Sequence, residues 1–369
     1  MTVMAIIMID QSCCRFWKSV VEKPKFWVSV VLYVNKENQD KVTQSRRINI
    51  IPEIRLYTIE VLEYLCRAVI KFEAKLKRLV VSVWGRIDLL DPELLSQAVV
   101  RLEECHLYLP SLSQTQIDSL FTAIQKSENL KLKMLELAHD DCSKVPPEIL
   151  ASALVKLEDV NVCAVTENQV KCLYDKMANS EIMNIRHVDS NLFDDENVSP
   201  ELFAEAFVRV ERLDTVSIDQ EKTGALLRKI ASLDSMKLKS LILEEEIDLS
   251  SFSSAVVCEA VVKLEELTIR CVLNPNLATE IFKRVAHCEP LKLKVLSLCA
   301  VDLSSVSPAV LTQAVSRLEK VQLRFCKLSP SHLKSLLNQV ADGKCLRLKH
   351  LDLQMNDMCR VPSIHCSVT

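Results

Sequence analysis

The chain has 369 residues, with 46 lysines and arginines against 49 aspartates and glutamates and a formal net charge of -3. Such an even balance of charges gives no general attraction to nucleic acids or anionic membranes, and the sequence predicts neither as a partner. Hydrophobic residues make up 49%, enough for a large core, but there are only three glycines, Gly85, Gly224 and Gly343. Glycine-rich phosphate-binding loops need several glycines close together, so the wide spacing excludes them.

The cysteines and the N-terminus indicate the compartment. The 15 cysteines form no CxxC pair, and no cysteine–histidine cluster has zinc-finger spacing. The first residues lack the basic start of a signal peptide, and charge-free apolar stretches near them reach only about nine residues, half of a membrane span. We therefore expect a soluble, cytoplasmic protein with free and mostly buried thiols.

Residues 1–54 show no repeat and are predicted to be a separate N-terminal segment that acts as a cap. Within them, the apolar run Trp27–Val34 predicts a strand and the polar stretch 35–47 a loop. A helical pattern of apolar residues appears between Ile59 and Val69, so a repeat array is expected to begin at residue 55.

Two short tags then recur with one period. The first is a basic residue followed by an apolar and an acidic residue; its copies begin at Arg101, Lys156, Arg209, Lys263 and Arg317, in steps of 55, 53, 54 and 54 residues. The second alternates apolar and basic residues; its copies begin at Leu130, Met236, Leu291 and Leu346, in steps of 106, 55 and 55 residues. The array over residues 55–358 is thus predicted to hold about ten to eleven repeats, in pairs of about 54 residues.

Each pair is predicted to read strand, helix, strand, helix. Alternating runs such as 132–137, 157–162, 293–298 and 318–323 predict strands with one buried face. Capping residues precede a proline in Asp91-Pro92, Ser199-Pro200, Ser307-Pro308 and Ser329-Pro330, Pro146-Pro147 varies this theme, and Ser113 precedes another helix. The stacked modules predict an α/β solenoid, with parallel strands on a concave face and helices on the convex face.

The spacing of the leucines resembles that of leucine-rich repeats. LxxLxL steps occur at Leu132-Leu135-Leu137, Leu293-Leu296-Leu298 and Leu348-Leu351-Leu353, and Cys326 and Asn356 match the Cys/Asn position of that family. The long alternating modules resemble the ribonuclease-inhibitor-like class, which implies a horseshoe, and they also look like the repeat arrays of NOD-like receptors. Residues 359–369 have no helical pattern and are predicted to be an irregular, truncated tail. That end would leave the last repeat either uncapped and open to association or covered by a partner.

No constellation of residues indicates catalysis. The seven histidines include no zinc-protease pair. His287 and Cys288 are adjacent, so on a helix their side chains point in different directions, and no third residue orients them. The sequence therefore predicts no enzyme, no catalytic residues, no cofactor and no metal site.

Function is accordingly expected on the surface. Residues between the core leucines are predicted to face the concave side and to bind a large protein partner, with Tyr108, Arg270 and Arg324 as anchors. The predicted partner-binding residues are Glu104, His106, Tyr108, Glu136, Asn161, Asp214, Thr268, Arg270, Lys320, Gln322, Arg324 and Asp352.

The main hypothesis is a non-catalytic protein–protein interaction scaffold whose partner is not identified by the sequence. One alternative is a ligand-sensing array related to NOD-like immune receptors. Another is a GTPase-activating leucine-rich-repeat protein, a class that the resemblance associates with an acidic C-terminal region; residues 360–369 contain no Asp or Glu.

Overall fold

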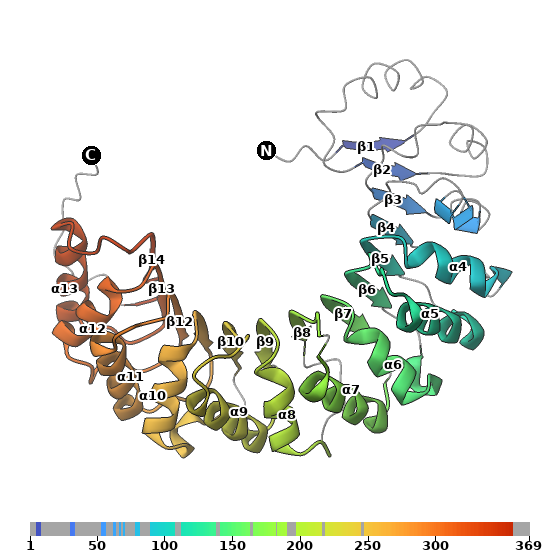
Figure 1. The fold of residues 1–369 in the computed structure, drawn as a ribbon. Coiled ribbons are helices and arrows are strands. Elements are labelled where there is room, and N and C mark those ends of the chain that lie inside the picture. Colours follow the sequence, from blue (N-terminus) through green and yellow to red (C-terminus); the bar gives the residue numbers. More distant parts are fainter. Residues whose placement is uncertain are drawn as a thin grey trace. The chain divides into compact units, whose positions relative to one another are not determined.

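The computed structural model describes strands at 5–8, 30–33 and 53–56, parts of residues 62–81, and residues 89–356 with short gaps (Figure 1). The gaps are residues 108–111, 138–140, 163–164, 182, 190–196, 216–217 and 245–246. The chain divides into two compact units. The first unit comprises Met1–Arg186 and Leu192–Asn197, and the second comprises His187–Asn191 and Val198–Thr369.

The first unit is built on parallel strands that neighbour one another in chain order. Strands β1 (Ala5–Met8) and β2 (Val30–Tyr33) form a parallel pair. A second ladder consists of β3 (Glu53–Leu56), β4 (Arg78–Val81), β5 (Glu104–Leu107), β6 (Met134–Leu137) and β7 (Asp159–Val162). The helices are α4 (Pro92–Val99), α5 (Gln114–Lys126), α6 (Pro147–Leu154) and α7 (Glu167–Asn179). Strand β2 lies in the predicted apolar run, whereas β1 was not anticipated.

The second unit repeats this plan. Its parallel strands, again in chain order, are β8 (His187–Asp189), β9 (Arg212–Thr215), β10 (Ser240–Leu243), β11 (Glu266–Ile269), β12 (Val295–Cys299), β13 (Lys320–Arg324) and β14 (His350–Asp352). Its helices are α8 (Pro200–Phe207), α9 (Gln220–Ser232), α10 (Ser254–Lys263), α11 (Pro275–His287), α12 (Pro308–Ser316) and α13 (Pro330–Ala341). The predicted α/β class, with parallel strands and alternating strand–helix modules, is confirmed.

The predicted helix starts are also confirmed. The side chains of Asp91, Ser199 and Ser307 each accept a hydrogen bond from a backbone N–H of the helix that they precede, and a proline occupies the first helical position. Ser113 and Ser329 form capping boxes, in which the backbone N–H of the cap also donates to the side chain of the third helical residue. These caps satisfy N–H groups that the first helical turn leaves unpaired. Helix α6 begins at Pro147 without a side-chain cap.

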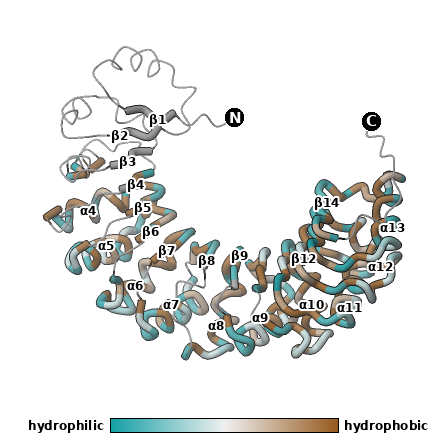
Figure 2. Tube along the Cα trace, turned by 180° about the vertical axis from the view of Figure 1, so that it is seen from behind, coloured by the Kyte–Doolittle hydropathy of each residue, from teal (hydrophilic) through white to brown (hydrophobic). Residues whose placement is uncertain are grey.

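The core leucines lie where the spacing predicts. Leu135, Leu137, Leu296, Leu298 and Leu323 are at most 1% exposed. The corresponding residues of the last described module, Leu348, Leu351 and Leu353, are only half-buried. Along the helices of both units, hydrophobic and hydrophilic residues alternate in Figure 2, as expected for helices that bury one side.

In three copies of the first tag, the basic residue caps the end of a preceding helix. Lys156 donates to the carbonyls of Gln125 and Ser127 at 2.5 and 2.9 Å, where α5 ends. In the second unit Lys263 does the same beyond α9, and Arg317 donates to the last carbonyls of α11. A cation stabilises these carbonyls because they carry the negative end of the helix dipole.

The acidic residue of the first tag pairs with a lysine of the second tag. Lys294 Nζ lies 2.6 Å from Glu265 Oε2, and Lys349 Nζ lies 2.6 Å from Glu319 Oε2. The backbone N–H groups of the same two lysines donate to the carbonyls of the same two glutamates at 2.7 Å. Residues of the two tags therefore form repeated contacts between neighbouring modules, at the edge where the strands begin.

Turn residues after the last strands contact neighbouring backbone. Asn356 Oδ1 accepts from the N–H groups of Cys326 and Leu328, and its Nδ2 donates to the carbonyl of Leu323 at 2.6 Å. The thiol of Cys326 donates to the carbonyl of Leu298 at 3.5 Å. Both side chains thus satisfy buried backbone groups of the preceding module.

Candidate protein-binding face of the sheets

The ladders from β4 to β7 and from β8 to β14 each have one face that the helices do not cover, and we call it the open face (Figure 1). Along β6, β7 and β10 half-buried and buried residues alternate, because successive side chains of a strand point to opposite faces. The buried positions are the core leucines and valines. The half-buried positions lie on the open face, where the sequence predicts the partner-binding residues.

The structure places the predicted residues on both units. In the first unit Glu104 and His106 lie on β5, Glu136 on β6 and Asn161 on β7. In the second unit Asp214 lies on β9, Thr268 on β11, Arg270 directly after β11, Lys320, Gln322 and Arg324 on β13, and Asp352 on β14. Tyr108, the predicted aromatic anchor, falls outside the described residues.

The ladder register brings several of these residues side by side. His106 is paired with Glu136, and Glu136 with Asn161, across β5, β6 and β7. Gln322 is paired with Asp352 across β13 and β14. Residues paired across neighbouring strands have side chains within reach of one another, so these sets are candidates for joint action.

In the first unit the side chains form a connected network. Arg78 Nε on β4 lies 3.1 Å from Glu104 Oε2 and donates to His106 Nε2 at 3.3 Å. His106 Nδ1 lies 2.6 Å from Glu136 Oε2, and Asn161 Nδ2 donates to Glu136 Oε1 at 3.4 Å. The network therefore spans four neighbouring strands.

Its geometry defines the protonation of the imidazole. Because Arg78 donates to Nε2 of His106, that nitrogen is the acceptor, and the proton of the neutral ring lies on Nδ1, which donates to Glu136. His106 is only 3% exposed. Both ring nitrogens are thus engaged within the sheet face, and the ring has little surface to offer a partner.

In the second unit the open face carries separate ion pairs. Arg270 Nη1 lies 2.8 Å from Glu244 Oε1, and Arg324 Nη2 lies 2.6 Å from Asp352 Oδ2. The arginine side chains remain 52% and 46% exposed, whereas those of Glu244 and Asp352 are 18% and 8% exposed. Each carboxylate therefore holds an arginine whose remaining N–H groups face solvent.

Asp352 is held charged by its surroundings. A hydrogen bond from the backbone N–H of Gln354, and then the Arg324 side chain, lower the pKa of Asp352 below its usual value. The same contacts fix its orientation, since Oδ1 accepts from Gln354 and Oδ2 contacts Arg324.

The other predicted residues of the second unit differ in their contacts. Asp214 Oδ2 lies 3.5 Å from Arg212 Nη2 and 3.6 Å from His187 Nε2. Lys320 is exposed, and Thr268 and Gln322 are half-buried. Within the described part of the chain, these last three make no side-chain ion pair or hydrogen bond. They are thus available to a partner.

Arg78 is the residue that the sequence analysis missed. It joins Glu104 to His106, yet no leucine-rich signature surrounds it. The register pairs Arg78 with Glu104 at the same strand position. Extending the module period one step toward the N-terminus from Glu104 would have found it.

Among the described residues there is no group of three or more His, Cys, Asp or Glu side chains that could hold a metal ion. None of the helices found in those residues combines the length and apolar character needed to cross a bilayer. Comparison with models of protein families found no match, and a search of curated proteins found none either.

Proposed function

We propose that the protein is a non-catalytic interaction scaffold, built from leucine-rich repeats of the ribonuclease-inhibitor-like class, that binds a protein partner on the open face. The repeat assignment is supported by the buried LxxLxL positions and by the hydrogen bonds of Cys326 and Asn356 to the neighbouring module. The horseshoe shape concerns the whole chain and stays a prediction. So do the boundaries at residues 54 and 358; residues 359–369 lie outside the described residues.

The observation that carries the proposal is the pair of half-exposed arginines on the second unit. Arg270 and Arg324 are each held in place by a largely buried carboxylate. An arginine ordered in advance loses less side-chain entropy on binding, and arginines are enriched among residues that dominate binding energy. Lys320, Thr268 and Gln322 add polar groups that the protein itself does not satisfy.

The test is partner recovery after charge reversal on the open face. The variants Arg270→Glu and Arg324→Glu, alone and together, would be compared with the wild type in quantitative affinity capture from cell lysate. We expect the double variant to lose a defined set of proteins that the wild type retains. Circular dichroism would verify that each variant is folded.

A matched control lies on the helical side of the same unit. Lys283 on α11 is half-exposed and forms only a local ion pair with Glu280, so Lys283→Glu changes the net charge as much as either single variant does, without touching the open face. If the double variant and this control recover the same proteins as the wild type, the open face is not the binding surface.

A further inference from the structure

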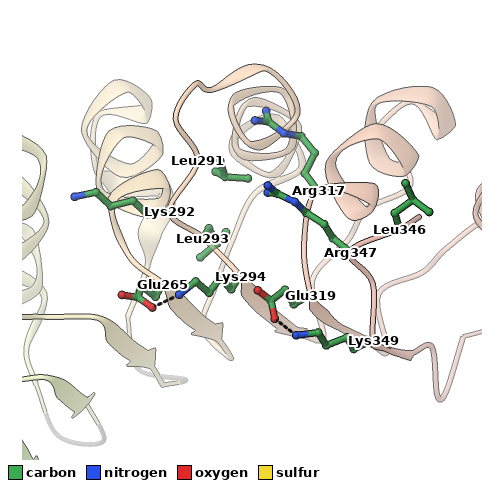
Figure 3. A pocket seen from close by; sticks show the side chains of 10 residues that line it. All are labelled: Glu265, Leu291, Lys292, Leu293, Lys294, Arg317, Glu319, Leu346, Arg347 and Lys349. Atoms are coloured by element: carbon green, nitrogen blue, oxygen red, sulfur yellow. Dashed lines mark hydrogen bonds and ion pairs between the residues drawn. The ribbon is translucent and has the colours of Figure 1, made fainter. Parts of the chain in front are cut away.

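A hollow of about 520 Å³ lies in the second unit, at the edge where its last strands begin (Figure 3). Two copies of the apolar–basic tag line it, the first from Leu291 to Lys294 and the next from Leu346 to Lys349. The hollow is therefore formed by the segments that precede β12 and β14. It is separate from Arg270 and Arg324, which lie beyond or at the other end of their strands.

The charge of the hollow is strongly positive. Five cations line it against two carboxylates, a net of +3: Lys292, Lys294, Arg317, Arg347 and Lys349 against Glu265 and Glu319. The whole chain, in contrast, has a net charge of -3. The basic character is thus local to this edge.

Two of the lysines are neutralised by the two carboxylates. Lys294 pairs with Glu265, and Lys349 with Glu319, each at 2.6 Å (Figure 3). Glu265 raises the pKa of Lys294, and Lys349 lowers the pKa of Glu319. Within each pair the positive charge of the lysine therefore offsets the negative charge of the glutamate.

Arg317 is also engaged by the protein. Its guanidinium donates to the carbonyls of Val285, Ala286 and Cys288, and it lies 2.6 Å from Glu289 Oε1. Its charge is offset by the end of α11 and by this carboxylate. Arg317 thus forms part of the wall of the hollow, and little of its charge is left for a ligand.

Lys292 and Arg347 are the cations that remain. Both are exposed, and among the described residues neither side chain makes a hydrogen bond or a close ion pair. The charge of Arg347 acts on Glu319 from farther away, but Lys349 already binds that carboxylate. Figure 3 shows the side chain of Arg347 extending in the same direction as that of Arg317, whereas Lys292 points outward from Leu291. The two cations therefore line different parts of the hollow.

The wall also has an apolar part. Leu346 is 93% exposed, the largest value among the exposed large hydrophobic residues of the described chain. Leu291 is half-buried, and Leu293 beneath it is buried. In Figure 3 Leu346 lies on the other side of Arg347 from Leu291, so the exposed leucine by itself gives an apolar side chain of a ligand a surface to cover.

We propose that this hollow binds an extended acidic segment of a protein partner, with an aliphatic side chain against Leu346 and carboxylates at Arg347 and Lys292. Charge complementarity selects the acidic partner. The leucines favour a peptide over a nucleic acid, because the lining residues include no aromatic ring on which a base could stack. The site extends the proposed function by a second contact surface with its own ligand chemistry.

The test is fluorescence anisotropy with two fluorescein-labelled peptides of ten residues. One consists of glutamates and aspartates around a central leucine, and the other has serine in place of that leucine. We expect the leucine peptide to bind the wild type at least about threefold more tightly than the serine peptide. We expect Arg347→Glu to weaken the leucine peptide roughly tenfold or more, and Leu346→Ser to remove the preference for leucine.

Two controls separate this proposal from the open-face proposal. Lys283→Glu and Arg270→Glu are expected to bind the leucine peptide as the wild type does. Equal binding of the two peptides to the wild type, no binding up to millimolar concentration, or unchanged binding by Arg347→Glu would each overturn the proposed site. A loss of peptide binding shared by Lys283→Glu would also overturn it, since the effect would then be one of general charge.

Discussion

The open faces of the two units use similar side chains in different ways. In the first unit Arg78, Glu104, His106, Glu136 and Asn161 form one connected network across four strands. In the second unit Arg270 and Arg324 each contact one carboxylate, and their side chains are about half exposed. Polar residues of the open face thus bind the modules to one another in one unit and offer charge to solvent in the other.

Position on a strand therefore does not by itself identify a binding residue. His106 and Arg270 are both predicted to face a partner, yet His106 is buried between its neighbours. A polar group with both hydrogen-bonding atoms engaged inside the protein has little left for a ligand. We accordingly expect substitutions in the first network to affect stability, and substitutions of the second pairs to affect binding.

The largest effect is expected from His106→Leu. The substitution removes the ring nitrogen that donates to the largely buried Glu136 carboxylate. It also removes the ring nitrogen that accepts a hydrogen bond from Arg78. Leaving buried polar groups unsatisfied costs about 1–3 kcal/mol, so the free energy of unfolding should fall by that amount. Urea unfolding followed by circular dichroism measures it.

A matched change in the second unit is Thr268→Val. Thr268 is half-buried at the equivalent strand position and has no side-chain partner among the described residues. Its replacement should change the free energy of unfolding by less than about 0.5 kcal/mol. Equal effects of the two substitutions would contradict the distinction between the two faces.

Much of the fold could be predicted from the sequence because it depends on local signals. Ser199 before Pro200 and the spacing of Leu293, Leu296 and Leu298 act within one module, and the structure confirms the helix and the strand that they predict. Strand β1 was missed because its short apolar run stands outside the leucine spacing. The first unit's Arg78 was missed for the same reason.

The chemistry of the candidate site was predicted less completely. Period-two alternation identifies which residues share a face, but it does not say which side chains satisfy one another. The pairing of Glu104 with Arg78, and of Arg324 with Asp352, depends on the ladder register and on rotamers. The hollow beside Leu346 arises from two modules together, so neither tag alone could indicate it.

A smaller effect is expected from uncoupling Arg324 and Asp352. A double-mutant cycle with Arg324→Met and Asp352→Asn should give a coupling free energy of about 1 kcal/mol. The more exposed pair of Arg270 and Glu244 should give less, about 0.5 kcal/mol, because solvent screens it better. Coupling of several kcal/mol in either cycle would show that these pairs stabilise the fold in the way that the first network does.

The second unit should also respond to acid through Asp302. A hydrogen bond from Ser304, with a further contribution from Lys327, lowers the pKa of Asp302 to about 2. Because the pKa is lower in the folded than in the unfolded state, the stabilisation is present above the unfolded value of about 4 and is lost as the pH falls toward 2. The stability difference between the wild type and Asp302→Asn should therefore shrink between pH 5 and about pH 2 in urea titrations. A difference that does not change over this range would contradict the assignment.

The smallest effect is expected in a comparison of two thiols within one protein sample. Cys105 on β5 is fully buried beneath the first network, and burial raises the pKa of its thiol. Cys299, at the end of β12, is half-exposed on the second unit. Because the thiolate is the reactive form, Cys105 should be alkylated by iodoacetamide at pH 8 at least about tenfold more slowly than Cys299.

Peptide mapping by mass spectrometry measures both rates in one sample. The His106→Leu variant should raise the alkylation rate at Cys105 alone, since it loosens only the network that covers that strand. Equal acceleration at Cys299 would mean that the substitution loosens both units, and the two open faces would then not be independent.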